Sequence, residues 1–237
     1  MQIIKSVFRS FSESIVDFIY PKICIISGKR LTEGNSNSFI EDNLLMNIEK
    51  ANPEEFREFK AALNAEFFFS SYIFRHDNEI QTMIHHLKYK GFTCIGEFLG
   101  EKAGNEIINR NKDILNNYHI LLPVPLFSSK MRERGYNQSY HICKGLNRIF
   151  NLELTVKNIL RTRNTKSQTG LSYEERVKNV RDAFTLEEES IPSLMNKGVI
   201  IVDDVLTTGS TIKEIVRTIK RSTNAKVGVV TLAVAKS

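Results

Sequence analysis

The sequence predicts an α/β fold, a parallel sheet flanked by helices and preceded by a small helical or irregular appendage. Apolar, β-branched or aromatic runs occur at residues 66–74, 118–125, 198–202 and 227–235. Short continuous runs of this kind are typical of strands buried on both faces. Segments with apolar residues at helical spacing alternate with these runs, and such alternation predicts a parallel sheet covered by helices.

The N-terminal quarter of the chain has a different pattern. Residues 2–19 carry apolar residues at helical spacing and predict an amphipathic helix that docks on the body of the protein, with a membrane surface as the alternative. Residues 22–50 show little periodicity, so they form either a small module or a loop across the main domain. We therefore predict an appendage over residues 1–60 and an α/β domain over residues 61–237.

Composition and the distribution of apolar residues argue against a membrane protein and against a secreted protein held by disulfides. The chain has 237 residues, a net charge of +6 and only three cysteines. No apolar run approaches the length of a membrane span, and Glu13 and Asp17 interrupt the N-terminal apolar residues, so we expect neither a span nor a secretory signal. Three cysteines far apart in sequence imply no disulfide framework, which fits a cytoplasmic protein.

Four helices are expected from the apolar spacing. Asn52 and Pro53 form a typical helix start, a polar cap followed by proline at the first helical position. The other three helices are expected at residues 78–89, 93–109 and 139–150.

The most informative stretch runs from Gly198 to Thr211. A buried strand is followed by two acids and a hydroxyl-rich turn, and then by apolar residues at helical spacing to about Lys220. Ser210 or Thr208 is a natural N-cap for that helix. Because ligands of open α/β sheets bind outside the carboxyl ends of the strands, and helix N-termini favour anions, this turn predicts a phosphate site. Its candidate residues are Thr207, Thr208, Gly209, Ser210 and Thr211.

The two acids of this stretch, Asp203 and Asp204, cannot bind a phosphate. They suit vicinal hydroxyls, or a magnesium ion held through water. A phosphate beside a diol is the outline of a ribose 5-phosphate. One alternative is a strand whose acids cap a helix or face solvent. A Walker B strand is the other, but the Gly-x-x-x-x-Gly-Lys-Ser/Thr partner that it requires does not occur in the sequence.

A second polar turn follows the strand at 118–125. Proline cannot donate in a central ladder, so the chain leaves the sheet at Pro123–Pro125. A basic turn with Arg132 and Arg134 comes next, and the guanidinium fork of arginine suits a pyrophosphate. Beside the phosphate turn we favour this hypothesis over a solvated turn whose cations pair with Glu133.

The segment from Lys157 to Arg181 is strongly basic, with seven cations against two acids. Either a solvated loop or a surface that binds polyanions has this composition, and the sequence leaves both open.

Together these stretches resemble one family, the ComF/GntX group of type I phosphoribosyltransferase-like proteins. The stretch from Asp203 to Thr211 resembles the family's signature for phosphoribosyl pyrophosphate (PRPP). The resemblance spans roughly residues 65–235. Its other matching residues are Leu87–Tyr89 with Gly91, Pro123–Leu126, Arg134–Gln138, Arg161 and Arg163 with Thr165 and Gln168, Arg176, Asn179–Val180 and Ala183–Phe184.

The resemblance implies a site for PRPP or a related ribose phosphate. The 5-phosphate would lie on Thr207–Thr211, and Asp203 and Asp204 would address the ribose hydroxyls. Magnesium would arrive with PRPP, without a direct protein ligand. The pyrophosphate contacts would be Val124, Pro125, Arg132 and Arg134, and the residues of a lid would be Arg161, Arg163 and Arg176.

Two departures limit what the resemblance implies. Many family members begin with a zinc module of Cys-x-x-Cys pairs, whereas Cys24 here is followed by Ser27 at the partner position, so we expect no zinc. Purine-salvage enzymes of the superfamily place an acid before the Thr-Gly of the signature, and this chain has Thr207 there. The acceptor and the catalytic base are therefore not predicted.

The family is associated with natural competence, the import of single-stranded DNA. The resemblance thus implies a phosphoribosyltransferase-like protein linked to DNA uptake, with competence-machinery proteins and single-stranded DNA among its partners. The alternative is a component that binds PRPP, a nucleotide or single-stranded DNA without turnover.

Overall fold

The computed structural model describes residues 21–162 and 181–236. The chain divides into two compact units, residues 1–48 and residues 49–237. The division falls before our predicted boundary at residue 60, because helix α3 (Phe56–Leu63) packs on strand β1 (Phe67–Phe74) of the larger unit.

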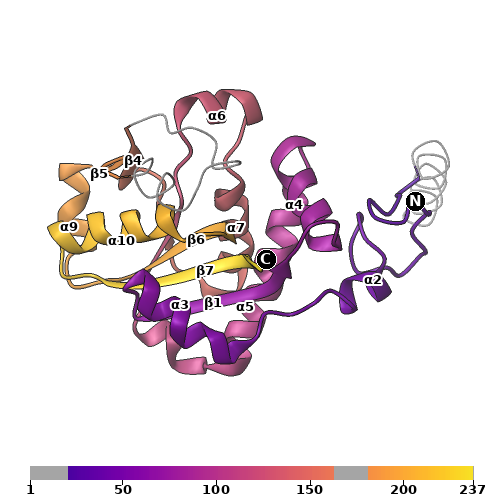
Figure 1. The fold of residues 1–237 in the computed structure, drawn as a ribbon, viewed down its shortest axis with the longest axis horizontal. Coiled ribbons are helices and arrows are strands. Elements are labelled where there is room, and N and C mark those ends of the chain that lie inside the picture. The colour runs from indigo at the N-terminus through magenta and orange to yellow at the C-terminus, as the bar shows by residue number, and fades with distance from the viewer. Residues whose placement is uncertain (1–20, 163–180, 237) are drawn as a thin grey trace, which may run out of the picture. The chain divides into compact units, whose positions relative to one another are not determined.

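The larger unit is built on a five-stranded sheet in the order β1-β7-β6-β2-β3 (Figure 1). Every adjacent pair in it is parallel, which confirms the predicted parallel sheet. The four strands besides β1 are β2 (Ile120–Pro123), β3 (Glu153–Leu154), β6 (Gly198–Leu206) and β7 (Lys226–Ala235).

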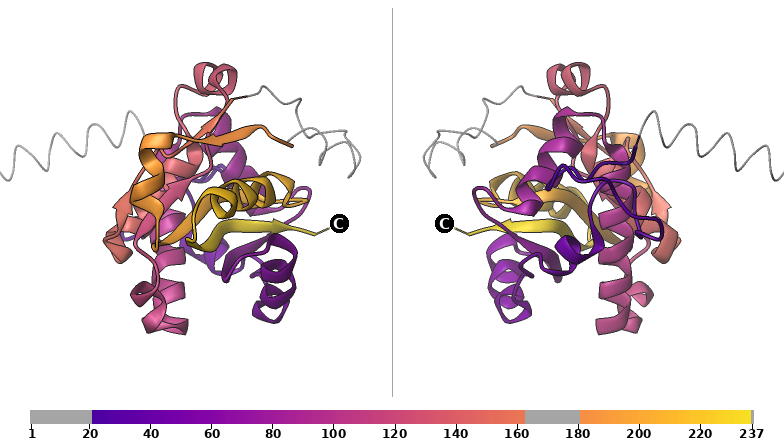
Figure 2. Two further views of the ribbon diagram at one scale, coloured as in Figure 1. Left: turned by 90° about the vertical axis from the view of Figure 1, so that its left-hand side faces the viewer. Right: turned by 90° about the vertical axis from the view of Figure 1, so that its right-hand side faces the viewer.

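Helices cover both faces of this sheet (Figures 1 and 2). Helices α4 (Glu79–Tyr89), α5 (Thr93–Arg110) and α7 (Gln138–Phe150) pack on one face, and α5 and α7 pack on each other. Helix α10 (Ser210–Ser222) packs with α3 on the other face. All five helices were predicted. Asn52, Asn78 and Asn137 each cap the start of a helix with their side chains.

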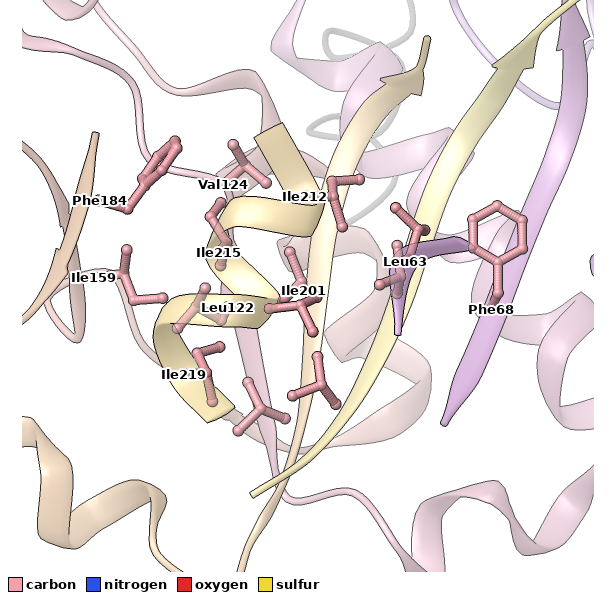
Figure 3. Close-up of a cluster of buried hydrophobic side chains, with 14 of the residues drawn as sticks. Leu63, Phe68, Leu122, Val124, Ile159, Phe184, Ile201, Ile212, Ile215 and Ile219 are labelled. Carbon is pink, nitrogen blue, oxygen red and sulfur yellow. The ribbon is translucent and has the colours of Figure 1, made fainter. Parts of the chain in front are cut away.

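The face covered by α10 holds a large cluster of buried apolar side chains (Figure 3). Ile212, Ile215 and Ile219 recur at helical spacing and are fully buried against Ile201 of β6 and Leu122 of β2. Burying an aliphatic side chain of this size contributes about 1.5–3 kcal/mol. This packing fixes the direction in which α10 leaves the end of β6, and so sets the position of the turn between them.

Two segments differ from expectation. The basic turn after β2 contains a short helix, α6 (Ser128–Arg134), which ends at Gly135 with a φ of 78°. The basic stretch contains a strand near its start, β4 (Ile159–Arg161), which pairs antiparallel with β5 (Phe184–Leu186) beyond its end. The remaining short elements are α2 (Asp42–Met46), η1 (Pro53–Glu55), η2 (Lys112–Asn116), η3 (Glu188–Ser190) and α9 (Ile191–Leu194).

In the smaller unit, side-chain hydrogen bonds organise residues 21–48. Asn35 donates to the carbonyls of Asn37 (2.8 Å) and Ile40 (2.7 Å), and Asn37 accepts from the backbone of Phe39 and Ile40. Cys24 is buried and accepts from the Ser27 amide at 3.4 Å. The predicted helix at 2–19 lies outside the described residues. Among those residues, no helix has the length and apolar character that crossing a membrane requires.

Helices α5 and α7 pack with their backbones in close approach, which Gly145 permits. A Cβ at Gly145 would overlap the Glu97 carbonyl oxygen of α5, and the neighbouring atoms are also backbone and cannot rotate away. We therefore predict that Gly145→Ala lowers the free energy of unfolding by about 2 kcal/mol or more, although alanine favours a helix over glycine by about 1 kcal/mol.

Urea denaturation followed by circular dichroism measures this change. The matched control is Gly104→Ala in α5, where the added Cβ would meet only the Ile149 side chain, at 3.1 Å. Equal stability changes in the two variants would contradict the packing argument.

Candidate functional site

The candidate site lies where the order in which the chain adds strands to the sheet reverses. The chain steps from β2 outward to β3, and later from β6 to β7 on the opposite side, so β2 and β6 flank the switch point. Strand β2 ends at Pro123, opposite Val202, whereas β6 continues to Leu206 beside β7. Beyond Val202, no strand of the described residues pairs with the β2 side of β6.

The two acids occupy this part of β6, where β7 is the one pairing strand among the described residues. We predicted them after the strand, but Asp203 and Asp204 lie within it, because β7 continues to pair with this end of β6. Pairing with β7 therefore holds the backbone of both acids in an extended strand.

Asp203 is held by two hydrogen bonds. Its Oδ1 accepts from the Ser139 hydroxyl of α7 at 3.1 Å and from the Asp204 amide at 2.9 Å. Burial, reinforced by the negative charge of Asp204, raises the pKa of the Asp203 carboxyl to about 7, and Lys88 and the two hydrogen bonds only partly oppose this. Close to neutral pH this carboxyl can therefore hold or release a proton.

Asp204 has a different partner. Its Oδ1 lies 2.9 Å from the Nζ of Lys88, in the last turn of α4, and its side chain is 6% exposed. Its Oδ2 is buried and has no hydrogen-bond partner among the described residues. We had not predicted Lys88 as a site residue. The available signal was its place in the basic end of the helix at 78–89, within the Leu87–Tyr89 motif.

The phosphate turn joins β6 to α10. Gly209 is the N-cap residue, with a φ of 72° that favours glycine. We predicted Ser210 or Thr208 as the N-cap, and this was wrong, because Ser210 is already helical and the Thr208 and Ser210 hydroxyls contact each other at 2.9 Å. Gly209 has no side chain with which to cap α10, so the helix begins without a side-chain hydrogen bond from its N-cap residue.

Cations gather on the α6 side of the acids. Arg134 donates to Gln138 at 2.7 Å and to the Tyr89 hydroxyl at 3.4 Å, and its guanidinium lies 5.1 Å from the centroid of the Tyr89 ring. Lys130 is partly buried. Burial lowers its pKa, and the positive charges of Arg134, Arg161 and Lys88 lower it further. Arg134, Arg161 and Lys88 therefore lie within electrostatic reach of Lys130, and we call these four residues the cation cluster.

The other predicted residues take separate places. Val124 is buried in the apolar cluster, and its carbonyl accepts from Asn137 at 3.0 Å. Pro125 is partly buried, and Arg132 is exposed on α6. Arg161 of β4 lies near Asp203. Burial lowers the pKa of the Arg161 guanidinium, and the negative charge of Asp203 partly opposes this effect. Arg163 and Arg176 lie outside the described residues.

Comparison with known proteins agrees with this architecture. Residues 146–237 match the phosphoribosyl transferase domain family. The DNA utilization protein YhgH of Shigella flexneri is 32% identical over 151 residues, which cover 63% of this chain and 65% of that protein. Competence protein F of Haemophilus influenzae is 35% identical over 101 residues, 43% of this chain and 44% of that protein.

Among solved structures, a hypoxanthine phosphoribosyltransferase from Staphylococcus aureus aligns with a TM-score of 0.34 at 18% identity, covering 59% of this chain and 62% of that one. The chain matches less than two thirds of the length of the relatives named above. The domain match and the identity to competence protein F confirm the resemblance that the sequence predicted, to the ComF group of phosphoribosyltransferase-like proteins.

Proposed function

We propose that this protein binds PRPP at the switch point between β2 and β6. One observation carries the proposal: two acids near the end of β6 are followed by the start of α10, and both lie close to cations of the cluster, Lys88 and Arg161. An anion site, a hydroxyl-binding pair and a second anion site in this order match the 5-phosphate, ribose and pyrophosphate of one PRPP molecule.

Each part of the ligand then has its own contacts. Thr207, Thr208, Gly209, Ser210 and Thr211 bind the 5-phosphate. The ribose hydroxyls donate to Asp204 Oδ2, which has no other partner among the described residues, and contact Asp203. Arg134 and Lys130 take the pyrophosphate, beside the backbone of Val124 and Pro125. Arg132 lies at the rim, because its side chain is exposed. Magnesium enters, where present, on the oxygens of PRPP itself.

The same arrangement supports transfer of phosphoribose to an acceptor. Cleavage of the bond between the anomeric carbon and the pyrophosphate oxygen leaves positive charge on the sugar and negative charge on the leaving group. Lys130 and Arg134 stabilise that negative charge, and Asp203 and Asp204 the positive charge. The acceptor supplies the electron pair for the new bond to the anomeric carbon. Its proton leaves to solvent or to a group that we do not assign.

The names of the relatives suggest the biological setting. Proteins named for DNA utilization and for competence are similar in sequence to this chain. We propose a cytoplasmic role in the uptake or use of DNA. The alternative is binding without turnover, of PRPP or of single-stranded DNA. The exposed ring of Tyr89 beside Arg134 favours the DNA form of this alternative, since aromatic and cationic side chains together bind single strands. Release of pyrophosphate and the salt dependence of binding separate these functions.

Calorimetric titration with PRPP and magnesium tests the proposed site. We expect saturable binding by the wild type and at least tenfold weaker binding by Asp203→Ala/Asp204→Ala, because the ribose loses its acceptors. The control is Asp113→Asn, which changes an exposed acid in η2. Absence of binding by folded wild-type protein would exclude PRPP as the ligand.

The two anion sites can be tested separately. Arg134→Gln removes a cation from the pyrophosphate end, so we expect PRPP affinity to fall about tenfold while ribose 5-phosphate affinity stays within twofold. Arg132→Gln, in the same helix but exposed, should change neither affinity. Equal losses for the two ligands would place Arg134 at the wrong end of the site.

The raised pKa of Asp203 predicts how stability depends on pH. The folded protein keeps this proton up to about pH 7, whereas the unfolded chain loses it near 3.8, so ionisation of the unfolded chain lowers the stability as pH rises between these values. Asp203→Asn cannot ionise. Relative to wild type, the variant should therefore gain about 1 kcal/mol or more in unfolding free energy between pH 5 and pH 8. Urea denaturation at both pH values measures this, and a constant difference would mean that the pKa is not raised.

A further inference from the structure

Lys88 places a positive charge directly at the ribose end of the site. Its Nζ lies 2.9 Å from Asp204 Oδ1, and the two side chains are 22% and 6% exposed. Solvent screens a pair this enclosed much less than a pair on the surface. The Lys88 ammonium therefore neutralises the charge of Asp204. Without Lys88, a cation bound at the ribose hydroxyls would have to neutralise it.

The fold fixes the position of Lys88. The preceding residue, Leu87, is fully buried, as are Met83 and Ile84 on the same side of α4. The Leu87 carbonyl accepts a hydrogen bond from the Tyr136 hydroxyl, which ties the end of α4 to the chain beyond α6. The lysine thus extends from an anchored backbone to Asp204.

The surroundings disfavour a divalent cation at these acids. A magnesium ion that approached Asp204 would replace Lys88 and would meet the positive charges of Lys130, Arg134 and Arg161 nearby. Asp203 offers a weaker ligand than usual, because its raised pKa keeps it partly protonated at neutral pH. No group of three or more His, Cys, Asp or Glu side chains suited to a metal occurs in the described parts of the chain.

We propose that Lys88 does the work of a divalent cation at the ribose end of the site, so that PRPP binds as the free anion without magnesium. This inference rests on the proposed PRPP site. An ammonium group has three N–H donors, and Asp204 takes one, which leaves two for a ribose hydroxyl and a pyrophosphate oxygen. The cation cluster supplies the remaining charge for the pyrophosphate. Magnesium already on PRPP is tolerated and adds little affinity.

Calorimetric titration of the wild type with PRPP, in EDTA and in magnesium, tests this directly. We expect the two dissociation constants to agree within about threefold, where tenfold corresponds to 1.4 kcal/mol. Binding in magnesium but not in EDTA would overturn the inference and leave the proposed function standing. Binding in neither buffer would overturn the proposed function itself, and this inference with it.

Variants then identify the residue responsible. Lys88→Met should weaken PRPP binding at least tenfold in EDTA and recover part of that loss in magnesium, because the metal can now approach Asp204. Lys90→Met is the matched control, since Lys90 follows α4 and is exposed. It should behave as wild type.

Because Lys88→Met leaves Asp204 buried without its partner, Lys88→Met/Asp204→Asn provides a variant without that charge. Its affinity in EDTA should be no better than that of Lys88→Met. Unchanged affinity in EDTA for either variant would overturn the role of Lys88.

Discussion

The ion pair between Lys88 and Asp204 joins elements that are far apart in sequence and determines the character of the site. It ties the last turn of α4 to the end of β6 that extends beyond β2. Removal of either partner alone would leave a buried charge, which typically costs 3–5 kcal/mol. The pair has a consequence beyond stability. An acid that would otherwise attract a metal is already neutralised, so the ligand must satisfy a site whose surroundings are predominantly positive.

Helices α5 and α7 help to position the acids, although most of their residues lie away from the site. The close approach of α5 and α7 at Gly145 fixes the axis of α7, and the first turn of α7 carries Ser139 to Asp203. Gly198 allows an equally close backbone approach at the other end of β6, because a Cβ there would overlap the Asn117 carbonyl oxygen. The position of the two acids thus depends on packing at both ends of the strand.

Much of the architecture could be predicted because it is encoded locally. Continuous apolar runs identified the main strands, and helical spacing with asparagine caps located the helices. Residue order alone located the two acids and the turn that follows them, before α10. The ion pair of Lys88 could not be predicted, since it depends on how two distant elements pack. The N-cap of α10 was misassigned for a related reason: Gly209 can adopt the positive φ that the turn needs, and this geometry outweighed the capping preference of serine and threonine.

The two acids also show why charge balance alone does not describe such a site. Cations lie near both, yet the pKa of Asp203 rises, because desolvation and the neighbouring Asp204 outweigh the attraction of Lys88. Asp204 holds the ammonium of Lys88, whereas Asp203 has hydrogen bonds from Ser139 and the Asp204 amide and a pKa raised to about 7. A ligand that brings negative charge close to Asp203 would favour its protonated form. Two adjacent residues of the same type would then play different parts, one as the partner of a lysine and the other as a group that adjusts its proton to the ligand.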